Sequence, residues 1–120
     1  MNPAIERTAF GSIVVGGVEF THDISIGLNG DVKRRKKELS KKEYGTSHKI
    51  SKKEAEAVYE TGAELLIIGS GMFNRVHLSE GAQAFLGERG CRVLLHPTGK
   101  AAKVWNTAEG KVLGLFHITC

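Results

Sequence analysis

A short run of branched apolar residues followed by a pair of glycines constrains the fold of this chain more than any other feature. Leu65 to Ile68 are all branched and apolar, and Gly69-Ser70-Gly71 follow directly. Such a run is typical of a strand covered on both faces, as in a parallel sheet. Glycines after a strand allow close approach of a ligand or another backbone. Ligands also usually bind at strand ends in open α/β sheets, so the stretch predicts both the centre of the fold and the place of any site.

After residue 51 the sequence alternates three times between a helical pattern and a strand pattern. Each predicted helix begins at a residue that can cap it and is followed by a glycine. The capping residues are Ser51, Ser79 and Thr98, and the glycines are Gly62, Gly90 and Gly110. Ser51 with Glu54 also forms a capping-box signature. The strands expected after the helices span 65–68, 92–95 and 112–118, which predicts a sheet with parallel pairs and right-handed crossovers.

The first third of the chain contains short strand signals. Gly16-Gly17 separates the apolar runs 13–15 and 18–20, as in a hairpin. Residues 22–28 alternate between apolar and polar, and Asn29-Gly30 then predicts a turn. We therefore expect an antiparallel β meander over residues 1–36.

A basic segment separates these two regions. Ten of the 17 Lys and Arg residues lie between positions 33 and 53, against only Glu38 and Glu43. Residues 37–50 have no apolar period and are predicted as a basic loop, with at most one helical turn near Ser40. A basic patch can attract phosphates, RNA or an acidic protein face. The alternative is a solvated edge that its lysines keep soluble.

Length and composition exclude several classes of protein. A chain of 120 residues with 41% hydrophobic content can form one domain with its own core. No apolar run approaches the roughly 20 residues that span a bilayer, and residues 1–10 lack the pattern of a secretory signal. We therefore expect a cytoplasmic protein that makes no membrane contact. In that compartment Cys91 and Cys120 are expected as thiols rather than as a disulfide.

Three separated segments resemble a small family of domains of unknown function, named for its archaeal Mth-type founding member. The segments are residues 36–50, the strand end Ile68-Gly69-Ser70-Gly71, and the ending Leu115 to Cys120. Relatives include an adipogenesis-associated protein and a mitochondrial assembly factor for respiratory complex I. The resemblance implies a three-layer α/β domain over 1–120, with a mixed central sheet, helices and an added N-terminal antiparallel β-hairpin layer. It brings no established reaction. Where a further glycine or small residue is expected after the turn, this chain has Asn74-Arg75.

Several well-known catalytic and binding motifs are excluded on inspection. The turn begins like a dinucleotide fingerprint, but Asn74 replaces the third glycine and no acidic residue ends the next strand. No phosphate-loop lysine follows the glycines, and Ser70 is not in a Gly-x-Ser-x-Gly elbow. The five histidines form no close pair with metal-ligand spacing. His117 and Cys120 give one His-x-x-Cys near an end that can fray. We expect no metal and no cofactor.

The candidate site is an anion-binding cleft in which the loop Tyr44–Lys49 folds over the glycine turn. Free backbone N–H groups of the turn would face the anion, and the side chains of His48, Lys49 and Arg75 would supply positive charge. The candidate ligand-binding residues are Tyr44, Ser47, His48, Lys49, Gly69, Ser70, Gly71 and Arg75. The competing interpretation is that the loop residues only hydrogen-bond the turn and hold the loop down.

Two function classes remain open. The first is a non-enzymatic binding or assembly domain with a protein-docking or small-anion cleft. The second is a small enzyme that acts on an anionic metabolite, with His48 as acid/base. The absence of paired carboxylates or of a known Cys–His order favours the first. The expected partner is a protein or a small anion. Sequence-specific nucleic-acid binding is not expected, because the basic run lacks a recognition helix and a stacking platform. The sequence leaves the oligomeric state open.

Overall fold

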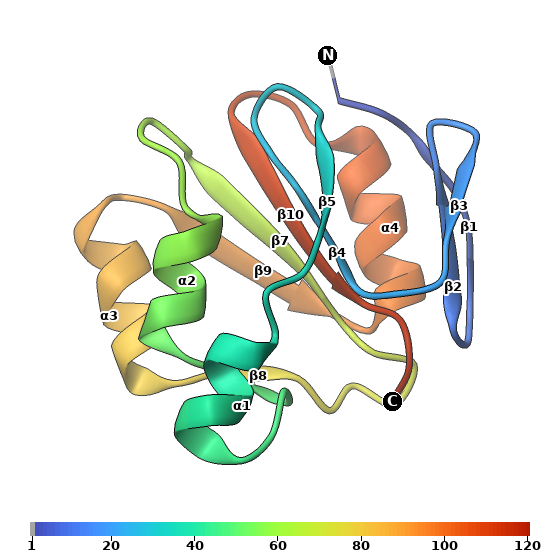
Figure 1. Ribbon diagram of the computed structural model, residues 1–120. Helices are drawn as coiled ribbons and strands as arrows, with labels where there is room; N and C mark the ends of the chain where they lie inside the picture. The colour runs from blue at the N-terminus through green and yellow to red at the C-terminus, as the bar shows by residue number, and fades with distance from the viewer. Residues whose placement is uncertain (1) are drawn as a thin grey trace.

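The computed structural model describes residues 2–120, which begin with five strands and continue with helices and strands interspersed (Figure 1). The elements are, in order, β1 (Ile5–Ala9), β2 (Ser12–Val15), β3 (Val18–Phe20), β4 (Ile24–Ile26), β5 (Val32–Arg34), α1 (Glu38–Tyr44), β6 (Lys49–Ile50), α2 (Lys52–Val58), β7 (Leu65–Ser70), β8 (His77–Leu78), α3 (Glu80–Glu88), β9 (Arg92–His96), α4 (Thr98–Thr107) and β10 (Val112–His117).

A five-stranded mixed sheet forms the middle of the molecule, with strand order β5-β4-β10-β7-β9. Strands β10, β7 and β9 are parallel, whereas β4 and β5 run antiparallel to their neighbours. The predicted strand Leu65–Ile68 is therefore an interior strand, and it continues through Ser70. The three helix–strand units α2-β7, α3-β9 and α4-β10 supply the parallel part, as the alternation after residue 51 predicts.

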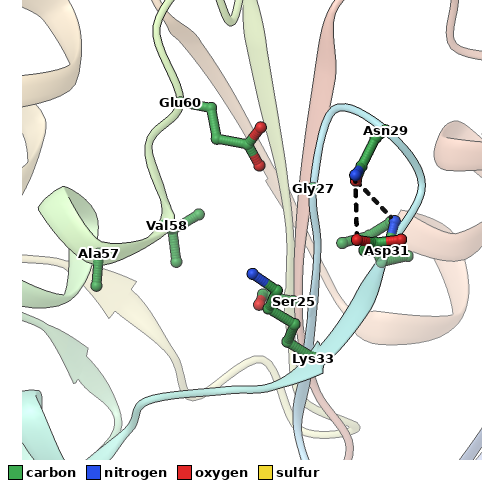
Figure 2. Close-up of a pocket in the computed structure, with 9 residues that line it drawn as sticks. Ser25, Gly27, Asn29, Asp31, Lys33, Ala57, Val58 and Glu60 are labelled. Carbon is green, nitrogen blue, oxygen red and sulfur yellow. Dashed lines mark hydrogen bonds between the residues drawn. The ribbon is translucent and has the colours of Figure 1, made fainter.

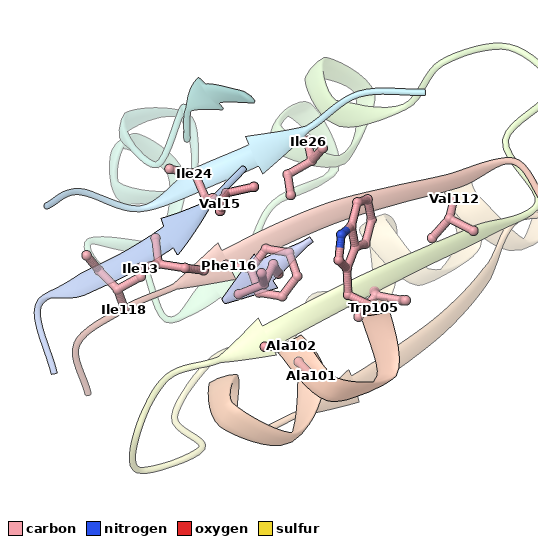
Figure 3. Packing of buried hydrophobic residues seen from close by; sticks show 12 residues of the cluster. Ile13, Val15, Ile24, Ile26, Ala101, Ala102, Trp105, Val112, Phe116 and Ile118 are labelled. Carbon is pink, nitrogen blue, oxygen red and sulfur yellow. The ribbon is translucent and has the colours of Figure 1, made fainter. Parts of the chain in front are cut away.

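Both faces of the central sheet are covered, which gives three layers. Helices α2 and α3 lie on one face, and α4 with the small sheet β1-β2-β3 lies on the other (Figure 1). Along β7, Ile67 packs into the α4 core, while Leu66 and Ile68 pack into the α2–α3 core. Trp105 on α4 is buried against the ring of Phe116, with ring centroids 6.1 Å apart (Figure 3). A strand covered on both faces must be apolar at every position, which explains the unbroken run at 65–68.

The N-terminal third does not form a single meander. β1, β2 and β3 form their own antiparallel sheet, and β4 leaves them to pair with β10 in the central sheet. Ile24 and Ile26 are both fully buried there, which stabilises the pairing. β1 was not predicted from the sequence, because only Ile5 of its five residues is buried and no alternation is visible.

The segment 37–50, predicted as a loop, contains helix α1. The helix ends at Gly45, which has a φ of 72° and donates to the carbonyl oxygen of Lys41. Only Ser40 is buried among the seven helical residues, so the helix has no apolar face that a periodicity search can detect.

Helix capping agrees with the sequence at two of three positions. The side chains of Ser51 and Ser79 accept hydrogen bonds from Glu54 N and Ala82 N, as predicted. Thr98 instead lies inside α4, whose N-cap is Pro97. Gly62 lies in the turn after α2 and does not end that helix, because α2 ends at Tyr59. Among residues 2–120, no helix has the length and apolar character needed to cross a membrane.

Candidate functional site

A buried arginine joins parts of the chain that are far apart in the sequence. The Nε and Nη2 atoms of Arg35 donate to the two carboxylate oxygens of Glu54 on α2, at 2.6 and 3.1 Å. Its Nη1 atom donates to Asp23 at 3.0 Å, and Nη2 also donates to the carbonyl oxygen of Ser47 at 2.6 Å. Two carboxylates therefore balance one buried cation, and the same cation fixes the loop before β6.

Two serines extend this buried network into α1. The Ser40 hydroxyl donates to Glu54 and accepts from the backbone N–H of Ser51 at 2.9 Å. Glu54 turns toward Arg35 and Ser40, so the predicted capping box forms only its Ser51 half. Every buried side-chain nitrogen and oxygen in residues 2–120 has a hydrogen-bond partner. A buried charged cluster is tolerated only under that condition.

Asp23 connects this network to the end of β10. Its Oδ2 atom lies 2.6 Å from Nδ1 of His117, and its Oδ1 atom accepts from the N–H of Ile118 at 2.9 Å. Burial alone would raise the pKa of Asp23. The hydrogen bonds from His117 and Ile118, with the charges of His117 and Arg35, outweigh burial and lower this pKa below its ordinary value. His117 lies on the same sheet face as Leu113 and Leu115, because side chains alternate along the strand.

The residues after β10 are held against the glycine turn. The N–H of Met72 donates to the carbonyl oxygen of Thr119 at 2.7 Å, and the N–H of Phe73 donates to the carbonyl oxygen of Cys120 at 3.4 Å. Gly71 has a φ of +97°, and a Cβ there would lie 2.5 Å from the backbone of Cys120. Gly71 is therefore required both for its own conformation and for the position of the tail. The His-x-x-Cys end, expected to fray, is fixed by backbone hydrogen bonds.

His48 completes the site from the loop before β6. Its Nε2 atom lies 3.6 Å from Sγ of Cys120, and its ring meets that of His117 edge to face at 5.4 Å. Burial and the positive charges of His117, Arg75 and Arg35 together lower the pKa of His48 below its ordinary value. The nearby Asp23 carboxylate opposes this shift. The neutral imidazole is thus the favoured form, with a lone pair available on one nitrogen.

The other predicted site residues do not all converge on His48. The ammonium group of Lys49 lies 4.5 Å above the ring of Tyr44, so these two side chains contact each other. Ser47 contributes its carbonyl oxygen to Arg35. Ser70 is fully buried and its hydroxyl donates to Asn74. Arg75 is exposed, and its charge is close enough to act on His48.

The glycine turn has roles that differ from a backbone anion cradle. The N–H of Gly71 donates to Thr98 Oγ1 at 2.9 Å. The N–H of Asn74 donates to the carbonyl oxygen of Gly71 at 3.3 Å. With Met72 and Phe73 bonded to the tail, the amides at 71–74 all have acceptors within the protein. At Gly69 a Cβ would lie 2.8 Å from the Phe116 ring, so this glycine makes room for core packing. Asn74 adopts a φ of 57°, which explains how it occupies a position where a glycine is expected.

A separate hollow lies at the opposite end of β10, between the β4–β5 turn and the end of α2 (Figure 2). It measures about 160 Å³, and Lys33, Asp31 and Glu60 are among its lining residues. Glu60 accepts from the N–H of Leu28, and Asp31 exchanges two hydrogen bonds with Asn29. The acidic side chains of this hollow thus stabilise the turn between β4 and β5.

Comparison with known proteins places this architecture in a family. A model described as "protein of unknown function (DUF498/DUF598)" matches residues 5–117. This chain belongs to the DUF498/DUF598 family. Among solved structures, a conserved hypothetical protein, PH1505, from Pyrococcus horikoshii OT3 is 33% identical, with a TM-score of 0.90 over 97% of this chain and 98% of that one. The structure titled MT938 is 32% identical, with a TM-score of 0.82 over 99% and 100% of the two chains.

A more distant structure carries the same fold. A Bordetella pertussis protein described as a Mth938-like domain is 21% identical, with a TM-score of 0.64 over 97% of this chain and 85% of that one. At that identity only the fold is shared. The Mth-type resemblance and the three-layer α/β fold are both confirmed.

Sequence reasoning missed three residues that organise the site of this DUF498/DUF598 chain. Asp23, Arg35 and Glu54 are single charged residues without a motif, and Arg35 stands among four other basic residues. A weak signal existed in the strand register. Asp23 and Arg35 stand just outside the paired strands β4 and β5, where Ile24 is opposite Arg34. Once the hairpin is assigned, the two residues are cross-strand neighbours.

Proposed function

We propose that this DUF498/DUF598 domain is a binding or assembly module that docks an acidic protein surface on its basic face. By basic face we mean the exposed basic side chains of residues 33–53, which are Lys33, Arg34, Lys36, Lys37, Lys41, Lys42, Lys52 and Lys53. One observation carries the proposal. Within residues 2–120, none of these eight side chains forms an ion pair with a carboxylate, and only two exposed acidic residues stand among them.

The buried network explains why this charge faces outward. Arg35 takes Asp23 and Glu54 as partners, so these carboxylates do not neutralise the lysines on the surface. Lys42 on α1 and Lys53 on α2 line one hollow of about 320 Å³, together with Leu39 and Glu43. An apolar residue rimmed by unpaired cations suits an acidic protein surface.

An assembly role is also what the resemblance to a respiratory complex I assembly factor implies. The alternative for the same charges is protection of an open sheet edge, which applies to Lys33 and Arg34 on the edge strand β5. The lysines of α1 lie off the sheet edge. They therefore distinguish docking from edge protection.

The test is binding of a fluorescent, glutamate-rich peptide at physiological salt. The triple variant Lys37→Gln, Lys41→Gln, Lys42→Gln should weaken binding about tenfold or more, because three unpaired charges leave the docking face. The matched control Lys100→Gln, Lys103→Gln, Lys111→Gln removes the same charge from exposed positions elsewhere. Equal weakening by both triples would show that only net charge matters and would exclude the docking face.

A second candidate function is binding of a small anion beside His48, with or without catalysis by its imidazole as acid/base. The positive charge of Arg75, which lowers the pKa of His48, favours it. Inorganic phosphate should then raise the melting temperature of the wild type. Lys49→Ala and Arg75→Ala should abolish that rise and leave the melting temperature in plain buffer nearly unchanged. If both variants unfold several degrees earlier without phosphate, these side chains are structural.

A further inference from the structure

We propose that His48, His117 and Cys120 form a binding site for a zinc-class transition-metal ion. The three side chains each offer one ligand atom, and within residues 2–120 these atoms all lie within 4.8 Å of one another. They come from the loop before β6, from the last residue of β10 and from the tail after it. The proposal goes beyond the docking function and does not depend on it.

The spacing between the His48 and Cys120 ligand atoms matches tetrahedral coordination. From Zn–N and Zn–S bond lengths, two nitrogens on one ion are expected about 3.3 Å apart, and a nitrogen and a sulfur about 3.5 Å apart. The observed Nε2–Sγ distance between His48 and Cys120 is 3.6 Å. Two imidazole nitrogens and one thiolate form a donor set of intermediate softness. Such a set binds zinc-class ions in preference to Mg²⁺ or Ca²⁺.

The surroundings of His117 fix the ring orientation that a metal ligand needs. Its Nδ1 atom bonds the buried Asp23 carboxylate at 2.6 Å, which leaves Nε2 as the nitrogen that can face a metal ion. Metal-binding histidines usually bond a carboxylate, a backbone carbonyl oxygen or a water through the other ring nitrogen. Asp23 is fixed in turn by Arg35 at 3.0 Å and by the N–H of Ile118 at 2.9 Å. Nε2 itself lies 3.2 Å from the Thr119 hydroxyl oxygen, and a metal ion would replace this contact.

The other two ligands are also fixed through the backbone. The carbonyl oxygen of His48 accepts from the N–H of His77 at 2.8 Å, and the N–H of His48 donates to Thr46 Oγ1 at 3.1 Å. The tail is held against Gly71, because Met72 N–H donates to the carbonyl oxygen of Thr119 and Phe73 N–H donates to that of Cys120. On binding, Cys120 releases its thiol proton to solvent and coordinates as thiolate. Three protein ligands leave a fourth position for water or another exogenous ligand.

The test uses the full chain, freed of metal by chelation and titrated with Zn²⁺ against a chromophoric chelator. The wild type should bind one equivalent, and Co²⁺ should give a thiolate-to-cobalt charge-transfer band. Cys120→Ser and His48→Gln should each weaken Zn²⁺ binding about 100-fold or more, since even loss of a residue that only orients a ligand costs about 10- to 100-fold. Neither change touches the buried Arg35 network. Failure of His117→Gln to fold therefore leaves the test intact.

Matched controls separate this site from adventitious binding. Cys91→Ala and His77→Gln remove a thiol and an imidazole that do not belong to the cluster, and Zn²⁺ affinity should stay within about threefold of the wild type. The Lys37, Lys41, Lys42 triple variant should also bind Zn²⁺ normally, so the metal site and the docking face can fail independently. If Zn²⁺ binds with far less than one equivalent, or if Cys120→Ser and Cys91→Ala behave alike, the site is excluded.

Discussion

Arg35 has a role opposite to that of its neighbours in the sequence. The basic residues on either side are exposed, whereas its guanidinium group is buried and bound to Asp23, Glu54 and the Ser47 carbonyl oxygen. A buried ion pair contributes little net stability compared with apolar packing, but removing one partner leaves buried charge uncompensated. Arg35 therefore joins the loop before β6 and helix α2 to the residue that precedes β4.

Replacing this arginine should be costly for stability. Arg35→Ala should lower the free energy of unfolding by roughly 3–5 kcal/mol, because two carboxylates lose their cation. The control is the adjacent, exposed Arg34→Ala, for which a change within about 0.5 kcal/mol is expected. Urea unfolding followed by circular dichroism measures both values. Similar losses for the two variants would contradict the assignment of Arg35 to the core.

Gly71 and Gly87 should respond in opposite directions to alanine. Gly71→Ala forces a side chain into a φ of +97° and against the Cys120 backbone, with an expected loss of about 1–3 kcal/mol. Gly87 lies in α3 with open space around a Cβ, and Gly87→Ala should stabilise by about 0.5–1 kcal/mol. Thermal unfolding of both variants checks the sign. A tolerated Gly71→Ala would mean that the tail is not fixed by the turn.

His48 predicts a pH dependence of stability. Its folded-state pKa is lowered, so the unfolded chain takes up a proton at higher pH than the folded protein does. The resulting stability is fully present above the unfolded value of about 6.5 and is lost as the pH falls through the folded pKa. His48→Gln should therefore flatten the fall in unfolding free energy between about pH 7 and pH 5. An unchanged slope in His48→Gln would refute the shift.

At the scale of elements, β10 and α4 pack closely through Phe116 and Trp105. Gly69 and Gly114 leave space on neighbouring strands for the Phe116 ring, since a Cβ at either position would lie within 2.8 Å of it. Trp105 fills the remaining volume above Phe116, and its indole N–H donates to the carbonyl oxygen of Pro3 at 2.8 Å. Gly69, which the sequence suggests as part of a ligand-binding turn, therefore makes room for core packing.

Trp105→Ala should cost about 3–5 kcal/mol, because it removes the largest fully buried side chain and leaves a cavity between α4 and the sheet. Lys103→Ala on the exposed side of the same helix should change stability by no more than about 0.5 kcal/mol. Chemical denaturation gives both numbers. A loss below about 1 kcal/mol for Trp105→Ala would show that the helix face is wrongly assigned.

For the whole molecule, charge is divided between a buried network and an exposed basic face. The basic face has the charge of a surface that binds polyanions, but it has no aromatic side chains on which bases could stack. Tyr44 is the only aromatic residue between positions 33 and 53, and its ring lies under the ammonium group of Lys49. Any attraction to nucleic acid should therefore depend on phosphate charge alone.

Two unrelated single-stranded oligonucleotides of equal length should bind equally and weakly. Binding should fall steeply as salt rises, because counterion release supplies the affinity. Fluorescence anisotropy at low and physiological salt measures the effect. Arg35 is buried and should not contribute. Submicromolar binding of one sequence that persists at physiological salt would contradict this expectation.

The sequence by itself determined the strand at 65–68, the three helix–strand units and two of the three helix caps. These features depend on neighbouring residues, because burial on both faces and capping hydrogen bonds leave a pattern along the chain. The family was also visible in three motifs. Helix α1 left no such pattern, since a single buried serine holds it to the core.

Only the tertiary structure decided the composition of the site. His48, His117 and Cys120 meet because β6, just after His48, pairs with β8, and β8 follows the turn at the end of β7, the parallel partner of β10. Asp23 and Arg35 belong there because β4 leaves the N-terminal hairpin to pair with β10. Isolated charged and ligating residues have no period, and their partners are set by strand pairing over long separations. Local sequence therefore determines the elements, and the pairing of distant strands determines which side chains form the site.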